Sequence, residues 1–189
     1  MKILYLSDEY PPENIGGSGS IAQRLAEGVA KGGHDVYVAA PSGSAVAGVT
    51  RVKNTTVYWL PRVRVGHPYL AGLRNAPMLK HIEAVMREVK PDVVHAHNLH
   101  WQLSYAALPL ARRYTERVFL TAHDLMYFGY GKMYPPRKVC MPPAEAARSC
   151  RASFLRDIRQ AKRQYIPWRG AAMRQCLRSA KQIFAVSDF

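Results

Sequence analysis

The feature that most constrains the fold is a pattern of strand, glycine loop, helix and second strand within residues 2–41. An apolar run, KILYLS, precedes glycines at positions 16, 17 and 19, and an amphipathic stretch then leads to a second apolar run, DVYVAA. Two short apolar runs joined by a helix predict a right-handed βαβ unit. The helix would begin just after the glycines, so its free N–H groups and positive dipole end would suit a phosphate or a sugar hydroxyl.

The glycines also have a simpler interpretation, because a strand-to-helix turn often needs glycine for its backbone alone. The spacing Gly16-Gly17-x-Gly19 differs from the Gly-x-Gly-x-x-Gly pattern of dinucleotide-binding loops. In addition, no acidic residue ends the second run, where that pattern would place one to bind a ribose. These departures disfavour NAD binding. Within the helix, we expect Ile21, Leu25, Gly28 or Val29, and Ala22 or Ala26 to lie on or near one apolar face.

Length and composition indicate one soluble α/β domain. The chain has 189 residues, 48% of them apolar, and no apolar run approaches the roughly 20 residues of a membrane span. The N-terminus becomes acidic too early for a signal peptide, which favours a cytoplasmic chain. The three cysteines, Cys140, Cys150 and Cys176, have no Cys-x-x-Cys spacing, so reduced thiols are the expected state and a metal site is the minority interpretation.

The charge is strongly basic and concentrated near the end of the chain. The net charge is +14, and residues 137–189 contain 12 Lys and Arg against three Asp and Glu. Such a segment favours polyanions: anionic lipid, nucleic acid or a phosphorylated substrate. No nucleic-acid-binding motif accompanies the charge, so we expect no nucleic-acid partner. The segment Arg148–Arg178 also has an amphipathic pattern, which raises the alternatives of docking on an anionic membrane and of packing on the sheet.

The rest of the chain continues the alternation of strands and helices. We expect a hairpin about Asn54, a loop at a cleft rim over residues 62–75, and helices over 76–89, 101–114, 144–165 and 168–180. Apolar strands are predicted within PDVVHAHN (91–98), RVFLTAHD (117–124) and QIFAVS (182–187). The predicted fold class is α/β, a Rossmann-like, mainly parallel sheet with helices on both faces.

Polar residues follow the predicted strands one after another. Ser7 and Asp8, the glycine loop, His97 and Asn98, His123 and Asp124, and Ser187 and Asp188 all stand at strand ends. The carboxyl ends of parallel strands share one edge of a sheet, where ligands of such folds bind. Their convergence on one edge is therefore the main functional signal. His95 shares a side of its strand with His97, and we interpret it as structural. His34 is expected in a turn, and His67, His81 and His100 on the surface.

In their order and spacing, the segments SDEYPPENIGGSGS, LAEGVAKGGHDVYVAAP, KPDVVHAHN, VFLTAHDL and SAKQIFAVSDF resemble the N-terminal domain of family 4 retaining glycosyltransferases of the GT-B fold. The resemblance covers essentially the whole chain. It implies that residues 1–189 are a single Rossmann-like domain that binds the acceptor. In such enzymes a second Rossmann-like domain holds the nucleotide-sugar, and this donor-binding domain is absent from the chain.

The resemblance also assigns roles to individual residues. His123 matches a histidine close to the reacting sugar and is the expected catalytic residue. Gly16 and Gly17 match the glycine loop near the donor phosphate and the acceptor. His97 and Asn98 match a strand end that lines the acceptor pocket, and Asp124 follows His123 as in many relatives. Ser187 matches the Val-Ser of the last strand. No Asp-x-Asp or metal triad is present, in keeping with a family that generally needs no bound metal.

The resulting functional hypothesis is transfer of a sugar, with retention, from a nucleotide-sugar co-substrate to a glycan or lipid-linked acceptor. No other cofactor is expected. The donor-binding domain would act in cis or in trans, and the protein would be cytoplasmic, with peripheral attachment to the inner face of the membrane as an open alternative. A competing hypothesis is a non-catalytic subunit of a split glycosyltransferase that binds the acceptor and docks on the membrane. On either hypothesis, this chain without its donor-binding half would be inactive.

Overall fold

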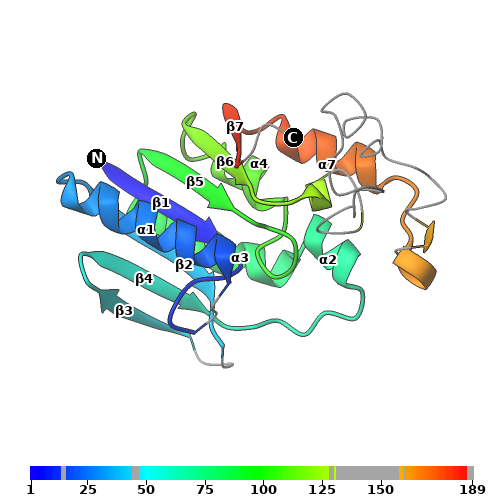
Figure 1. Cartoon of the computed structure of the whole chain (residues 1–189), viewed down its shortest axis with the longest axis horizontal. Helices are drawn as coiled ribbons and strands as arrows, with labels where there is room; N and C mark the ends of the chain where they lie inside the picture. Colours follow the sequence, from blue (N-terminus) through cyan, green and yellow to red (C-terminus); the bar gives the residue numbers. More distant parts are fainter. Residues whose placement is uncertain (14–15, 44–46, 128–129, 131–157, 160, 187–189) are drawn as a thin grey trace, which may run out of the picture.

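A computed structural model describes residues 1–13, 16–43, 47–127, 130, 158–159 and 161–186. These residues form an α/β domain built on a seven-stranded sheet of order β3-β4-β2-β1-β5-β6-β7 (Figure 1). The strands are β1 (Lys2–Ser7), β2 (Asp35–Pro41), β3 (Gly48–Val52), β4 (Thr55–Leu60), β5 (Val93–His97), β6 (Val118–Ala122) and β7 (Gln182–Ala185). The predicted Rossmann-like fold class is confirmed.

The strands run parallel except at one edge, where β3 pairs antiparallel with β4. The predicted hairpin is therefore present, and its second arm joins the main sheet beside β2. The strand order reverses at β1, which lies between β2 and β5. In parallel sheets of this type, the point of reversal opens a crevice at the carboxyl ends of the strands.

Helices lie on both faces of the sheet, as predicted. They are α1 (Gly17–Lys31), α2 (Pro68–Leu73), α3 (Ala76–Val89), α4 (Ala107–Ala111) and α7 (Arg169–Leu177), with short 3-10 turns at Leu125–Tyr127 and Lys162–Gln164. α1 covers one face, over β1 and β2, and α3 and α4 cover the other (Figure 1). Two apolar cores follow from this layering: Tyr10, Ala22 and Trp59 belong to the core under α1, and Leu6, Ile82 and Leu120 to the core under α3.

The buried side of α1 differs from the predicted one. Ala22 and Ala26 are fully buried against the sheet, whereas Ile21 and Leu25 are each 41% exposed. Small side chains on the inner side allow the helix axis to approach the sheet closely, and the larger residues are consequently turned outward. The prediction for the core face was therefore right for Ala22 and Ala26 and wrong for Ile21 and Leu25.

Two further expectations were wrong around the β5 loop. Residues 62–75 are not all loop, because Pro68–Leu73 forms α2, with the His67 ring accepting a hydrogen bond from the Leu70 N–H at 3.2 Å. The helix predicted over 101–114 is reduced to Ala107–Ala111. Ser104 takes a left-handed conformation with φ 62°, which interrupts a helix, and the backbone N–H groups of residues 101–103 before it bind the Asp8 carboxylate.

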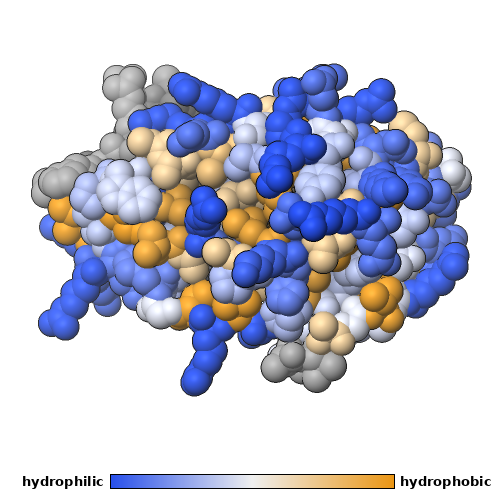
Figure 2. Space-filling model, turned by 180° about the vertical axis from the view of Figure 1, so that it is seen from behind, coloured by the Kyte–Doolittle hydropathy of each residue, from blue (hydrophilic) through white to orange (hydrophobic). Residues whose placement is uncertain are grey.

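Most of the predicted helix over 144–165 lies outside the described residues, including its apolar residues Phe154 and Leu155. Cys140 and Cys150 lie outside them as well. The last predicted helix is present as α7. In the described part of the chain, every helix is too short or too polar to span a membrane. Seen from behind, the molecule shows hydrophilic side chains around and over a hydrophobic area in the middle of this face (Figure 2).

Candidate functional site

The carboxyl edge of the sheet brings together three of the predicted strand ends. Ser7 of β1 pairs with His97 of β5, and His97 pairs with Thr121 of β6, so the residues just beyond them share one edge. His123 follows β6 by one residue, and Asp8 follows β1 directly. The predicted convergence of polar residues is therefore real in space.

Two histidines are joined at this edge. His97 Nδ1 lies 2.9 Å from His123 Nε2, and the ring centroids are 5.2 Å apart. His97 is fully buried, whereas His123 is half-buried. His95 lies deeper on the same side of β5, where Nε2 is 2.8 Å from the Thr121 hydroxyl. This bond and its ring contacts with Tyr5 agree with a structural role for His95.

Burial sets the charge of the histidine cluster, defined as His95, His97 and His123. Desolvation lowers the pKa of His97 to about 3 and that of His95 to about 4, and neighbouring histidines add to both shifts. Desolvation also lowers the pKa of His123, although the Asp124 and Glu9 carboxylates oppose the shift. The buried rings are therefore neutral near pH 7, and a proton would be taken up most readily at the more exposed His123.

Neutral rings leave one polar atom of His97 to be satisfied. Because the contact between His97 and His123 needs one donor and one acceptor, His97 Nε2 is a bare acceptor in one tautomer and an N–H donor in the other. Among the described residues, neither His97 Nε2 nor the Asn98 Oδ1 atom has a hydrogen-bond partner, and both are buried. A hydroxyl group both donates and accepts, so it would satisfy His97 Nε2 in either tautomer.

Asp8 clamps the loop that follows β5. Its Oδ1 accepts hydrogen bonds from the backbone N–H groups of Gln102 at 3.0 Å and Leu103 at 2.8 Å, and its Oδ2 accepts from Trp101 at 2.8 Å. Desolvation raises the pKa of the Asp8 carboxyl, and these three donors oppose the shift. The sequence analysis placed Asp8 among the polar residues at strand ends; the structure shows that it anchors the loop that holds Asn98 and Trp101.

The same loop contains a second buried polar residue, His100. His100 is 2% exposed, which makes the predicted surface position wrong, and its Nε2 lies 3.0 Å from a carboxylate oxygen of Asp124. The His100 Nδ1 atom bonds the Tyr105 hydroxyl. Asp124 Oδ1 also accepts the Met126 N–H at 2.9 Å. Asp124 therefore turns toward the interior of the domain, where it fixes the loop after His123.

Arg169 was missed by the sequence analysis, which treated it as one of many basic residues near the end of the chain. It is 4% exposed, and its guanidinium donates to the Met126 carbonyl at 2.8 Å. The same group lies 4.7 Å from the centre of the Tyr130 ring and 5.9 Å from that of Tyr69. No periodicity or spacing marks this arginine as buried, because its partners come from distant parts of the chain.

The Glu9 side chain packs against the first residues of α1. Its carboxylate accepts the Ser18 hydroxyl at 2.7 Å, and a side chain at Gly16 would collide with that carboxylate. A Cβ at Gly19 would lie 2.7 Å from the Glu9 carbonyl oxygen, whereas a Cβ at Gly17 would meet nothing within 4 Å. Gly16 and Gly19 thus allow close packing of the Glu9 segment. The open position is Gly17, where a ligand can approach the helix N-terminus.

The remaining site predictions find no test here. Ser187 lies outside the described residues. Within the described ranges, no group of three His, Cys, Asp or Glu side chains could hold a metal ion.

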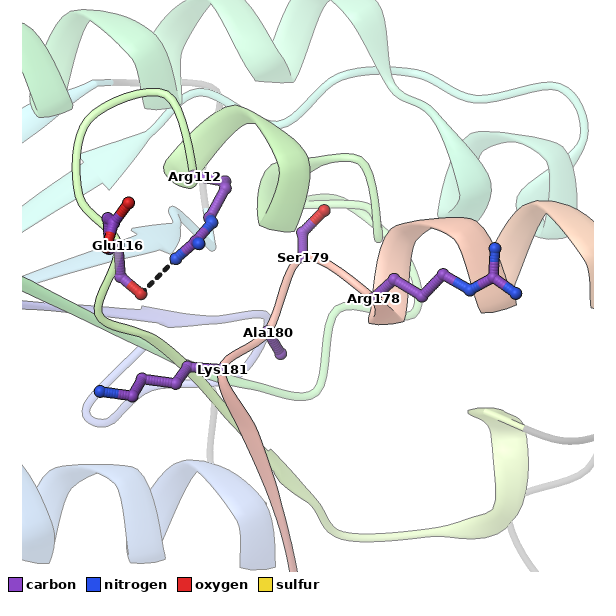
Figure 3. Close-up of a pocket in the computed structure, with 6 residues that line it drawn as sticks. All are labelled: Arg112, Glu116, Arg178, Ser179, Ala180 and Lys181. Carbon is purple, nitrogen blue, oxygen red and sulfur yellow. Dashed lines mark hydrogen bonds between the residues drawn. The ribbon is translucent and has the colours of Figure 1, made fainter.

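A basic pocket of about 170 Å³ lies at the opposite, amino edge of the sheet, between the loops that precede β6 and β7 (Figure 3). It is lined by Arg112, Glu116, Arg178, Ser179, Ala180 and Lys181. Arg112 and Arg178 cap the C-termini of α4 and α7, and Arg112 donates to the Glu116 carbonyl. Cations at helix C-termini compensate the negative end of the dipole, so these two need no anionic ligand to explain them.

The fold defines a Rossmann-like domain with polar residues gathered at the carboxyl edge of its sheet. The family model described as Glycosyltransferase Family 4 matches residues 15–189. The chain therefore belongs to glycosyltransferase family 4.

Two curated relatives extend this likeness. The chain is 33% identical over 147 residues to a protein named glycogen synthase from Mycobacterium tuberculosis (strain CDC 1551 / Oshkosh), with 65% of this chain and 33% of the relative covered. It is 28% identical over 138 residues to an uncharacterized 42.6 kDa protein in the cps region of Klebsiella pneumoniae, covering 66% of this chain and 37% of that protein. The chain thus spans about a third of the length of the curated relatives it matches.

Proposed function

We propose that this domain binds the acceptor of a glycosyltransferase that moves a sugar from a nucleotide-sugar to a glycan or lipid-linked acceptor with retention of configuration. The observation that carries the proposal is the pair His97 and His123 at the carboxyl edge, together with the buried and unpartnered His97 Nε2. The family to which the chain belongs, and its likeness to a protein named glycogen synthase, make a sugar hydroxyl the natural ligand for that atom.

The chemistry assigns separate tasks to the two histidines. During transfer, the bond between the anomeric carbon and the phosphate oxygen breaks, a bond to the acceptor oxygen forms, and the acceptor proton leaves. Positive charge develops at the anomeric carbon, so oriented polar groups close to it stabilise the transition state. His97 is buried and neutral, which suits it to hold a hydroxyl in place. His123 is more exposed and can hydrogen-bond the reacting sugar or accept a proton.

The donor-binding half completes the proposal. We place it in a GT-B arrangement, in cis or in trans, with its nucleotide-sugar facing the carboxyl edge of this domain and Gly17 as the accessible backbone position. No metal or other cofactor is part of the proposed step. Docking of Arg148–Arg178 on an anionic membrane remains a proposal for lipid-linked acceptors; residues 148–157 and 160 of that segment lie outside the described residues.

The test is a His123→Ala substitution in the full-length protein, assayed with a panel of nucleotide-sugars and glycan acceptors. We expect kcat to fall by about a hundredfold or more, as for a positioned acid–base or hydrogen-bonding group. His81→Ala, an exposed position on α3, serves as the control and should leave kcat unchanged. Circular dichroism checks the fold of both variants, and a folded His123→Ala enzyme with normal kcat would show that His123 is structural.

Two further measurements complete the test. The anomeric configuration of the product, read by NMR, should match that of the donor. Residues 1–189 alone should show negligible transfer, because on this proposal the nucleotide-sugar is bound by a separate half of the enzyme. Robust multiple turnover by this domain alone would contradict the proposal that a separate half of the enzyme binds the nucleotide-sugar.

A further inference from the structure

Two aromatic side chains lie side by side next to the clamped β5 loop. Tyr69 comes from α2 and Trp101 from the loop after β5, and their ring centroids are 6.1 Å apart with the planes tilted by 44°. Both residues are only half-buried. Half-buried Tyr and Trp side chains are common on protein surfaces, but two of them in contact present a joint apolar surface that a ligand can cover.

Contacts with Tyr130 hold the Tyr69 ring in place. The Tyr130 ring meets Tyr69 edge to face at 4.7 Å, and the Tyr69 hydroxyl donates to the Tyr130 carbonyl at 3.2 Å. The buried Arg169 guanidinium lies over the Tyr130 ring at 4.7 Å. A ring packed against a buried cation and a second ring has little freedom to move, and this retains one orientation for Tyr69.

The Trp101 side is fixed through the backbone. Its N–H donates to Asp8, and the side-chain amide of the next residue, Gln102, bonds both the N–H and the C=O of Val63, at 2.9 and 3.0 Å. α2 is locked onto the same loop, because Tyr105 N–H donates to the Gly72 carbonyl at 2.7 Å and a Cβ at Gly72 would collide with the His100 backbone. Tyr69 and Trp101 are therefore held in one relative arrangement before any ligand arrives.

The position of the pair relates it to the histidine cluster. The Asp8 that clamps Trp101 directly follows Ser7, the β1 partner of His97. His100, the neighbour of Trp101, bonds Asp124, the neighbour of His123. Two short links thus join the aromatic pair to the same edge of the sheet. Among the described residues, none accepts a hydrogen bond from the Trp101 indole N–H, which leaves that donor available for a ligand.

We propose that Tyr69 and Trp101 form an aromatic shelf that binds a pyranose ring of the acceptor. A pyranose offers an apolar C–H face that packs on aromatic rings, and hydroxyls around its rim that can take the indole N–H. Preorganised aromatic surface with a few polar groups is typical of small-ligand sites, and its rigidity lowers the entropic cost of binding. This inference rests on the proposed glycosyltransferase function and deepens it, since it assigns the acceptor rather than the donor to these rings.

The test measures acceptor and donor binding separately in the full-length protein. An array of mono- and oligosaccharides first identifies a glycan that binds, and steady-state kinetics follow with that glycan as acceptor. Trp101→Ala and Tyr69→Ala should each raise the ratio of acceptor KM to donor KM tenfold or more. Trp101→Phe keeps an aromatic ring and should change the ratio by less than about threefold, the order expected for a partial loss of contact area.

A matched control and a solution readout complete the design. Trp168 is 55% exposed at the start of α7, so Trp168→Ala removes an exposed indole elsewhere and should leave the ratio unchanged. Saturation-transfer NMR should show the C–H protons of the bound glycan close to aromatic protons in the wild type and not in Trp101→Ala. Trp101→Phe keeps the measurement informative if Trp101→Ala fails to fold.

The outcomes separate this inference from the proposed function. An unchanged ratio in both alanine variants overturns the shelf, as does a rise in donor KM alone, which would indicate stacking of the nucleobase instead. If the wild type transfers no sugar, the proposed function fails. The array then decides the shelf by itself: glycan binding that Trp101→Ala abolishes supports it, and the absence of any glycan binding overturns it.

Discussion

Removing the Asp8 carboxylate should destabilise the domain strongly, because this one side chain holds three backbone N–H groups. Asp8 is 7% exposed, and its three bonds come from the consecutive residues 101–103. A hydrogen bond to a charged partner contributes about 1.5 kcal/mol at the low end of its range, so the loss of all three bonds in Asp8→Ala should cost about 4.5 kcal/mol.

An asparagine at the same position separates the individual bonds. Oδ1 accepts the Gln102 and Leu103 donors, and Oδ2 accepts only that of Trp101. In Asp8→Asn the carbonyl oxygen can keep the first two bonds, while the amide N–H₂ faces the Trp101 N–H and loses the third. We therefore expect a cost of about 2 kcal/mol, roughly half that of the alanine variant.

Urea unfolding followed by circular dichroism measures both costs. With a slope of about 2 kcal/mol per molar urea, Asp8→Ala should lower the unfolding midpoint by about 2 M. Asp92→Ala is the control, because the Asp92 carboxylate is exposed and accepts the single backbone N–H of Lys2 at 2.8 Å. It should cost less than about 1 kcal/mol. The reasoning fails if Asp8→Ala costs no more than Asp92→Ala, or if the alanine and asparagine variants are equally stable.

Two other predictions follow from the same structure. Because burial lowers the pKa of His97 to about 3 and that of His95 to about 4, the unfolded chain binds protons that the folded chain does not. The free energy of unfolding should accordingly fall as pH drops from about 6.5 toward 3, by up to about 1.4 kcal/mol per pH unit for each histidine. The double variant His95→Gln/His97→Gln should show a flatter dependence of this free energy on pH, measured by urea unfolding between pH 6.5 and 5, where carboxylates still hold their charge. An equal slope in the variant and the wild type would contradict this prediction. Gly72→Ala should destabilise α2 despite the better helix propensity of alanine, because the new Cβ would collide with the His100 carbonyl. Gly28→Ala in α1 is the matched control, because a Cβ there would contact no described atom within 4 Å, and it should stabilise the domain by about 0.5–1 kcal/mol. Thermal unfolding of the pair decides this, and stabilisation by both substitutions would refute the clash at Gly72.

The sheet was predictable because its strands carry their own signal. Runs such as KILYLS and DVYVAA are apolar on both faces, as strands buried between two helix layers must be, and the edge they share follows from their parallel order. That edge placed His97 and His123 together correctly. It also identified His95 as a neighbour of His97 on one side of the strand, and their ring centroids are 4.5 Å apart.

The loop after β5 shows a limit of structure prediction from apolar spacing alone. Apolar spacing in residues 101–114 predicted a helix, but the spacing says nothing about a carboxylate 93 positions away that binds the N–H groups of residues 101–103. Ser104 then takes a left-handed conformation with φ 62°, which interrupts the helix, and the chain carries Trp101 and the buried His100 on a fixed loop instead. In this loop, the residues that sequence periodicity misplaced are held by long-range polar contacts. They are also the ones that connect the histidine cluster to the aromatic shelf, as expected when a functional edge is shaped by contacts other than the core pattern.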